Sequence, residues 1–281
     1  MDAVLKKELS IKACQIRKMA IEAVYSAQSG HPGGSLSAAD VLAYLYFHEM
    51  RIDPKNPKKA DRDRFVLSKG HCTPALYSTL ALRGYFPTEE IKGFRHLGHF
   101  LQGHPDMKGV PGVDMSTGSL GQGISAACGI ALSGKLSGAG YRVYAVLGDG
   151  ELEEGQVWEA AMFAHQYKLD NLCALVDFNG LQIDGKITDV MSSIPIPEKF
   201  RAFGWNVIEI GAHNFDEIDA AYTQAKTVKG KPTMIVARSV KGKGVSFMEN
   251  QAGWHGSAPN AEQFAQAEKE LDAALAELEV G

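Results

Sequence analysis

Long hydrophobic runs are missing from this sequence of 281 residues. Nowhere do about eighteen apolar residues stand together, which is the length that a membrane-spanning helix needs. The N-terminal residues MDAVLKKEL also lack the apolar segment of a secretory signal peptide. We therefore expect a soluble, cytoplasmic protein that makes no contact with a membrane.

Cysteine is scarce and scattered. Cys14, Cys72, Cys128 and Cys173 stand far apart, which excludes a disulfide framework and a zinc motif of closely spaced cysteines. Reduced thiols of this kind usually serve as small apolar groups. Cys72 directly follows His71, so the sequence leaves open a thiol near a ligand at that position.

Clustered positive charge is missing as well. The net charge is −4, and acidic and basic residues are interspersed along the chain. Without a basic stripe, nucleic acid is not an expected partner. The chain is 45% hydrophobic and 22% charged, as globular proteins usually are, and no repeat or break in composition divides it. We expect residues 1–281 to form a single domain.

Apolar runs alternate with segments of helical periodicity. The apolar runs are 65–67, 143–147, 172–176, 206–210 and 233–237. The expected helices are about 10–29, 37–49, 121–137, 156–167, 216–228 and 261–279. Because Pro32 and its neighbouring glycines cannot continue a helix, we expect a loop at 29–35. Strands that alternate with helices predict an α/β fold of three layers, α/β/α, around a mainly parallel sheet.

Two polar clusters follow buried strands of the predicted sheet. Gly148-Asp149-Gly150 comes directly after the run 143–147, and Asn179-Gly180-Leu181 follows the next run. The carboxyl ends of parallel strands are where such sheets bind ligands. The Asp149 carboxylate, the Asn179 amide oxygen and the Leu181 carbonyl are the oxygen ligands that Mg²⁺ prefers, and it commonly shares them with a diphosphate. Ca²⁺ or Mn²⁺ could replace it. Gly-Asp-Gly alone also makes an ordinary turn, so the second cluster carries the prediction.

Histidines stand in several of the glycine-rich loops. These loops are Ser29–Ser35, Ser68–His71, Gly103–Pro105 and 253–256, and they contain His31, His71, His104 and His255. A single loop histidine is more often solvated or capping than catalytic. Histidine nevertheless suits proton transfer, because its unperturbed pKa lies near neutrality.

The order of these motifs, together with Ser116–Gly123, resembles transketolase over residues from about 10 to about 260. The Gly-Asp-Gly and the later Asn resemble the fingerprint that holds thiamine diphosphate and its metal. The resemblance implies a thiamine diphosphate-binding fold, Mg²⁺ and sugar phosphate substrates. It also implies that His71 and His255 contact the cofactor diphosphate and the transferred ketol oxygens, and that His31 and His104 bind the substrate.

Further roles are implied only by the resemblance. The backbone of Gly150 would approach the diphosphate, Gly118 and Leu120 would line the thiamine cavity, and Ile183 would pack on the thiazolium ring. Glu154 and Glu159 match acidic positions at the contact between the two cofactor sites of a dimer. The run that holds them, 151–159, is equally well explained as a solvated helix start.

The chain departs from the family in one loop and in its length. Phe100-Leu101-Gln102 stands where many transketolases have Arg-Thr-Pro, which affects the donor site but keeps His104. Transketolases also carry a pyrimidine-binding domain and a C-terminal domain, and 281 residues hold only the diphosphate-binding part. The resemblance therefore implies the N-terminal subunit of a split transketolase, which forms an α2β2 heterotetramer with a separate C-terminal subunit.

Two alternatives remain. The chain could belong to a related thiamine diphosphate enzyme that acts on an unusual sugar phosphate, or to the deoxyxylulose-phosphate synthases, which are normally one long chain. It could also be a non-catalytic subunit that binds the cofactor and stabilises a partner.

Overall fold

The computed structural model describes residues 1–280, and a five-stranded sheet lies at its centre. The strand order is β1-β2-β3-β7-β6, and every neighbouring pair is parallel. These strands are β1 (Arg64–Leu67), β2 (Val143–Gly148), β3 (Leu172–Phe178), β6 (Asn206–Gly211) and β7 (Thr233–Arg238). The mainly parallel sheet predicted from the alternation of strands and helices is confirmed. Its carboxyl ends all lie along one edge.

Successive residues of the central strands point to opposite faces of the sheet, as the two-residue period requires. Tyr144 and Val146 of β2 belong to one apolar core, whereas Val143, Ala145 and Leu147 belong to the other. Both faces are therefore covered. This explains why the strands read as continuous apolar runs rather than as alternating ones.

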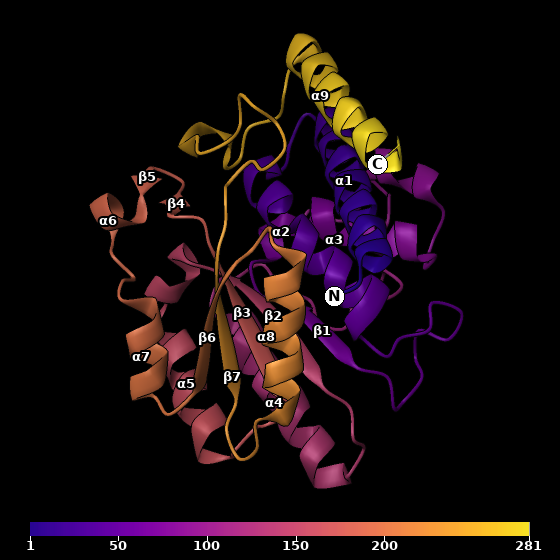
Figure 1. Cartoon of the computed structure of the whole chain (residues 1–281). Helices are drawn as coiled ribbons and strands as arrows, with labels where there is room; N and C mark the ends of the chain where they lie inside the picture. The colour runs from indigo at the N-terminus through magenta and orange to yellow at the C-terminus, as the bar shows by residue number, and fades with distance from the viewer. Residues whose placement is uncertain (281) are drawn as a thin grey trace.

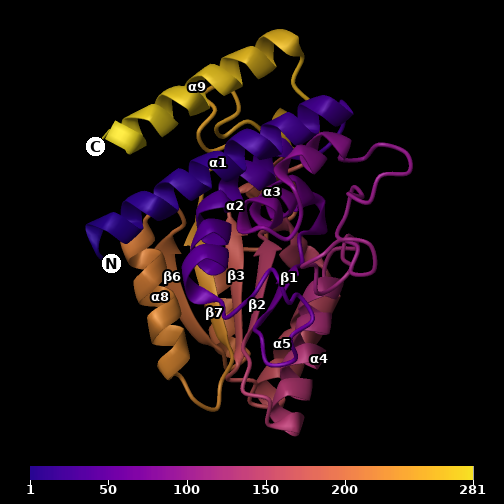
Figure 2. The same ribbon diagram turned by 90° about the vertical axis from the view of Figure 1, so that its right-hand side faces the viewer.

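Helices fill the layers on both sides (Figures 1 and 2). The first core is closed by α1 (Ala3–Ala27), α2 (Pro32–Tyr44), α3 (Thr73–Arg83) and α8 (Phe215–Thr227). The second core is closed by α4 (Gln122–Ser137), α5 (Gly155–Gln166) and α7 (Ile196–Ala202). Figure 2 shows α8 on one side of the sheet and α4 and α5 on the other. This is the predicted three-layer α/β/α arrangement.

The remaining elements lie outside these layers. A small antiparallel ribbon joins β4 (Leu181–Gln182) to β5 (Gly185–Lys186), and α6 (Ile187–Val190) follows it. The last helix, α9 (Ala261–Val280), lies across α1 in both views. None of the helices within residues 1–280 is both long and apolar enough to cross a bilayer.

Three helix boundaries or caps differ from the prediction. α1 begins at Ala3 rather than near 10, because the Asp2 side chain caps it by accepting from Leu5 N at 2.8 Å. α2 begins at Pro32 rather than 37, since proline is favoured in the first helical turn, where its missing N–H costs nothing. Thr88 is not an N-cap, because Pro87 occupies that position.

The C-terminal helix begins with the predicted capping box. Gln263 N donates to Asn260 Oδ1 at 2.9 Å, and Asn260 N donates to Gln263 Oε1 at 3.0 Å. Leu271 is buried against α1 as expected. Ala274, however, is exposed, and the neighbouring Leu275 turns inward instead.

Candidate functional site

A cavity of about 370 Å³ opens at the carboxyl edge of the sheet. Its walls come from the segments that follow β1, β2, β3 and β7, together with the start of α2. The predicted site residues that line it are His31, His71, Gly118, Leu120, Asp149, Gly150, Glu154, Asn179, Leu181, Ile183 and His255. The structure thus brings together residues that lie more than two hundred positions apart in the sequence.

Two of the predicted residues lie outside this cavity. The His104 side chain is exposed, and its ring stands beside Gly118, where an added Cβ would meet His104 Cδ2 at 2.8 Å. His104 therefore borders the cavity at Gly118 without lining it. Glu159 is exposed on α5 and does not line it either.

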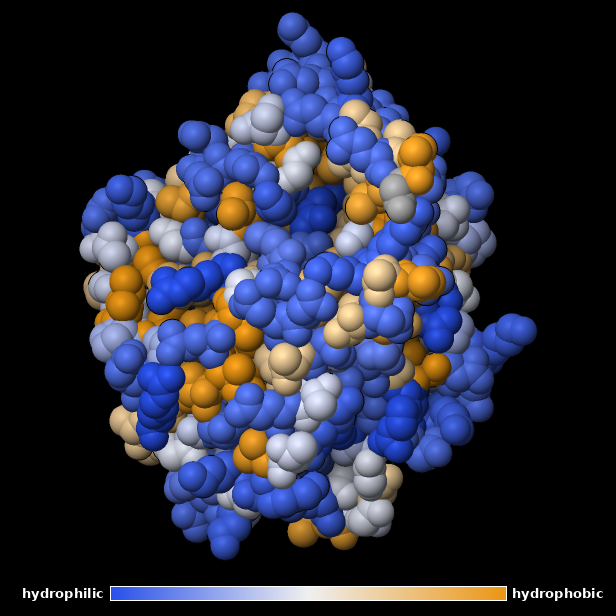
Figure 3. All heavy atoms as spheres, in the orientation of Figure 1, coloured by the Kyte–Doolittle hydropathy of each residue, from blue (hydrophilic) through white to orange (hydrophobic). Residues whose placement is uncertain are grey.

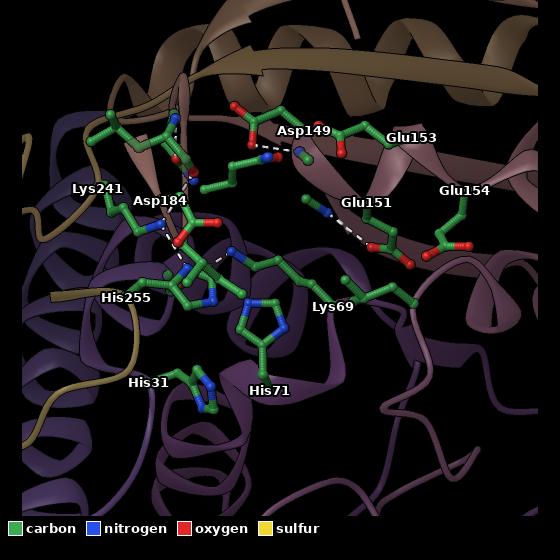
Figure 4. Close-up of a pocket in the computed structure, with 18 of the residues that line it drawn as sticks. His31, Lys69, His71, Asp149, Glu151, Glu153, Glu154, Asp184, Lys241 and His255 are labelled. Carbon is green, nitrogen blue, oxygen red and sulfur yellow. Dashed lines mark hydrogen bonds between the residues drawn. The ribbon is translucent and has the colours of Figure 1, made fainter. Parts of the chain in front are cut away.

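Three histidine rings form a cluster on one wall (Figure 4). The ring centroids of His31, His71 and His255 lie 5.1 to 5.4 Å from one another. Burial, together with Arg95, lowers the pKa of His31 to about 4. Burial, together with Lys241, lowers the pKa of His255 to about 3, and the pKa of His71 is also well below its usual value. All three are neutral at physiological pH.

Two buried lysines give the cavity its positive charge. Lys69 is 1% exposed and donates to Gly34 O at 2.8 Å while it pairs with the Asp177 carboxylate. Lys241 is 2% exposed, and its Nζ lies 2.8 Å from His255 Nδ1 and 3.1 Å from Leu181 O. Burial, and then the charge of Lys69, lowers the pKa of Lys241 to about 8.

The predicted metal ligands lie on the opposite wall. Asp149 is 2% exposed, and its carboxylate accepts from Gly180 N at 2.5 Å and from Gly150 N at 2.9 Å. Burial and the nearby Asp177 raise the pKa of Asp149 to about 6. A cation beside this carboxylate would offset that penalty.

The donor set fits an anionic cofactor held with a hard cation. Lys69 and Lys241 supply positive charge, and the Nδ1 atom of His31 is buried with no hydrogen-bond partner among the described residues. Residues 1–280 contain no group of three or more His, Cys, Asp or Glu side chains suited to a metal. A metal at Asp149 would therefore need further oxygen ligands, which a diphosphate provides.

Sequence reasoning missed Lys69, Lys241 and Glu151 as residues of this cavity. The first two stand in the Ser68–His71 and 241–244 segments, and a buried lysine has no local sequence signature. Glu151 belongs to the acidic run interpreted as a solvated helix start or a dimer contact. It is in fact 2% exposed, whereas Glu154 in the same run is exposed.

Two further positions need comment. Cys72 is fully buried beneath the site, where burial raises the pKa of its thiol. It therefore packs as a neutral group against Gly34, where an added Cβ would lie 2.8 Å from Cys72 Sγ. In the departing loop, Leu101 is buried, Phe100 packs on Phe86, and Gln102 is exposed.

Fold and cavity together define a class of protein: an α/β domain that binds a phosphorylated cofactor at the carboxyl edge of a parallel sheet. Residues 8–278 match the family described as the transketolase, thiamine diphosphate binding domain. The chain belongs to this family, and it is a transferase of the transketolase type. The match extends over nearly the whole chain.

Individual relatives agree with this assignment. The chain is 48% identical over 265 residues to the 6-deoxy-6-sulfo-D-fructose transketolase subunit SqwG of Clostridium sp. (strain MSTE9), covering 94% of this chain and 96% of that protein. It is 42% identical over 271 residues to one named subunit of the apulose-4-phosphate transketolase of Phocaeicola vulgatus, covering 96% of both.

Longer transketolases match over part of their length. The human enzyme is 44% identical over 246 residues, which are 87% of this chain and 39% of that protein. The solved transketolase of Campylobacter jejuni superposes with a TM-score of 0.88 at 32% identity, covering 99% of this chain and 46% of that one. The chain thus spans less than half the length of these two enzymes.

Proposed function

We propose that this chain is the diphosphate-binding subunit of a split transketolase, which transfers a two-carbon ketol unit from a ketose phosphate to an aldose phosphate. One observation carries the proposal: a single cavity gathers eleven of the predicted site residues, all except His104 and Glu159. Two relatives whose names call them subunits match this chain over 96% of their length, which supports the split arrangement.

Thiamine diphosphate supplies a carbanion and an electron sink for breaking and forming the carbon–carbon bond. In the proposal, the chain holds its diphosphate with the Gly150 backbone, His71 and His255. Asp149, Asn179 and Leu181 hold Mg²⁺, with Ca²⁺ or Mn²⁺ as possible substitutes.

The other residues bind or orient the reacting groups. Gly118 and Leu120 form the thiamine cavity, and Ile183 covers the thiazolium ring. His31 and His104 hydrogen-bond the substrate hydroxyl and carbonyl. Since His31 is neutral, it can donate one hydrogen bond and accept another without carrying charge.

The chain's surface supports a partner. Ile183 at the cavity is 68% exposed, and Met191 in the segment between α6 and α7 is 62% exposed. Figure 3 shows apolar side chains gathered over that segment and the edge strand β6. Exposed apolar surface of this kind commonly marks an interface. The proposed partner is a separate C-terminal transketolase subunit with the pyrimidine-binding domain, in an α2β2 heterotetramer, with Glu154 and Glu159 near the contact between sites.

The test is reconstitution. The chain alone, given Mg²⁺, thiamine diphosphate, a ketose phosphate and an aldose phosphate, should show no ketol transfer, and activity should appear when a pyrimidine-domain subunit is added. Robust turnover without a partner contradicts the split arrangement. Calorimetric titration separates the non-catalytic alternative, which predicts cofactor binding but no turnover with any partner.

The names of the two relatives support a second candidate, a transketolase for an unusual sugar. One is named for a sulfonated fructose and the other for apulose 4-phosphate. The reconstituted enzyme should therefore be assayed with 6-deoxy-6-sulfofructose and apulose 4-phosphate beside common ketose phosphates. The donor with the highest kcat/KM identifies the substrate class.

A further inference from the structure

Glu151 is a carboxylate where a carboxylate is unexpected. It lies in the short 3-10 turn Gly150–Glu153 that follows β2, and only 2% of its surface is exposed. Glutamate is almost never fully buried unless its charge is paired or hydrogen-bonded. No salt bridge to Glu151 is present among residues 1–280, so its partners must be hydrogen-bond donors.

Three donors from three different segments converge on this side chain. Ser68 Oγ and Gly121 N donate to Glu151 Oε1, the second at 3.0 Å. Gly148 N donates to Oε2 at 3.0 Å. Figure 4 shows Glu151 at the back of the cavity with its carboxylate hydrogen-bonded to the surrounding chain. One side chain therefore joins the end of β1, the start of α4 and the end of β2.

Each of these segments carries residues of the proposed site. Ser68 directly precedes Lys69, and Gly121 directly follows Leu120. Gly148 directly precedes Asp149. Displacement at any one of the three hydrogen bonds would therefore move a group that faces the cofactor.

The packing around these segments leaves little freedom. A Cβ added to Gly123 would lie 2.6 Å from Ser68 Cα, and one added to Gly70 would lie 2.7 Å from Gly118 N. Backbone meets backbone at both places, with no flexible side chain to absorb a shift. The register between the segments is consequently set by this close packing and by the shared carboxylate.

We propose that Glu151 is a positioning residue that fixes the three cofactor-binding segments relative to one another, an inference that rests on the proposed cofactor site. Glu151 acts through Lys69, Leu120 and Asp149, not by touching the reacting atoms. Its substitution weakens cofactor binding more than it weakens the fold.

The charge state of the side chain matters because two of its donors are backbone N–H groups that cannot accept a hydrogen bond. In Glu151→Gln the amide has almost the same volume, but its NH₂ must face either Gly121 N or Gly148 N. One donor then opposes another in a buried place, whichever way the amide turns. A residue that merely filled space would tolerate this change.

Asp63 provides a matched control at the opposite end of β1 and β2. It is also 2% exposed, and its carboxylate accepts from Arg51 N at 2.9 Å and from Arg142 N at 2.8 Å. Asp63→Asn therefore breaks the same kind of buried contact far from the cavity. It should lower stability but change cofactor affinity by less than about twofold, as for independent sites.

The experiment titrates the full chain with thiamine diphosphate and Mg²⁺ in a calorimeter and follows thermal unfolding of the same samples. Glu151→Gln should weaken cofactor binding about 10- to 100-fold, the usual loss for a residue that supports a ligand-binding group. Excess cofactor should restore turnover of the reconstituted enzyme in large part. Ser68→Ala, which removes one of the three donors, should give a smaller loss and covers the case that Glu151→Gln does not fold.

The outcomes separate the inference from the proposed function. If the unsubstituted chain binds cofactor and both Glu151→Gln and Ser68→Ala bind it within about twofold of that affinity, the positioning role is wrong. The same conclusion follows if Asp63→Asn loses as much affinity as Glu151→Gln. If the unsubstituted chain binds no thiamine diphosphate with or without a partner, the proposed function itself fails.

Discussion

The buried ion pair between α1 and α2 should be the most costly one to break outside the cavity. Asp40 is 6% exposed and Arg17 is 8% exposed. Arg17 Nη1 donates to Asp40 Oδ1 at 3.3 Å, and Nη2 makes a second contact with Oδ2. His213 Nδ1 donates to the same Asp40 Oδ2 at 2.7 Å, since His213 Nε2 accepts from Val240 N at 2.9 Å. Asp40→Asn keeps the volume but leaves the Arg17 charge unpaired.

Removing one partner of a buried pair costs about 3–5 kcal/mol, because the other charge stays buried without compensation. For a chain of this size that corresponds to a fall in Tm of roughly 6–20 °C. The control is Asp272→Asn, which removes the exposed partner of Lys18, 2.5 Å away between α9 and α1. Exposed pairs are worth about 0.2–1 kcal/mol. The two substitutions should therefore differ several-fold in their effect on the free energy of unfolding.

The pH dependence of this loss has a definite sign. Burial alone would raise the pKa of Asp40, but Arg17 and His213 hold it at about 2, below its usual value of 3.8. A depressed carboxyl pKa stabilises the fold above the unfolded value, and that contribution disappears as the pH falls through the folded value. The difference between the native chain and Asp40→Asn should be constant from pH 5 to 8 and shrink only below about pH 4.

Urea unfolding followed by circular dichroism at several pH values measures these differences directly. Equal destabilisation by Asp40→Asn and Asp272→Asn would refute the importance of burial for this pair. A stability difference that changes markedly between pH 5 and 8 would refute it as well.

Two further predictions concern the proposed site. Asp149→Ala should abolish Mg²⁺-dependent thiamine diphosphate binding in calorimetry while circular dichroism stays native, because the diphosphate charge loses a cation beside it; unchanged affinity would remove Asp149 from the metal site. His104→Ala should lower turnover on the order of 10²-fold, or raise the donor KM, with little change in cofactor affinity, because His104 only borders the cavity. A collapse of cofactor binding in that variant would move His104 from the substrate to the cofactor.

The elements of the central sheet could be predicted because buried parallel strands have a strong local signature. The runs 143–147 and 172–176 lie within β2 and β3, and the polar clusters after them mark the carboxyl edge. The start of α2 could not be read in the same way. Pro32, Gly33 and Gly34 have the composition of a loop, and only tertiary packing shows why glycine is needed in that helical turn: a Cβ on Gly33 would lie 2.8 Å from Trp254 O.

The charged groups at the base of the cavity were hidden for a related reason. Lys69, Lys241 and Glu151 look like surface residues in the sequence, because solvated and buried charges have the same local pattern. Their burial depends on partners far along the chain, such as Asp177 for Lys69 and Gly121 for Glu151. Only the assembled fold brings these partners together.

The packing of α9 on α1 has a consequence for how the chain folds during synthesis. Cys14 of α1 donates its thiol to Leu271 O of α9, across 257 positions of sequence. At about 5–20 residues per second, the ribosome needs roughly 13–50 s to deliver the second residue after the first. For all of that time the outer face of α1, with Cys14 and Ile21, is an apolar surface without its cover. A nascent chain stalled before residue 261 should therefore bind chaperones through α1, whereas the finished chain hides that surface.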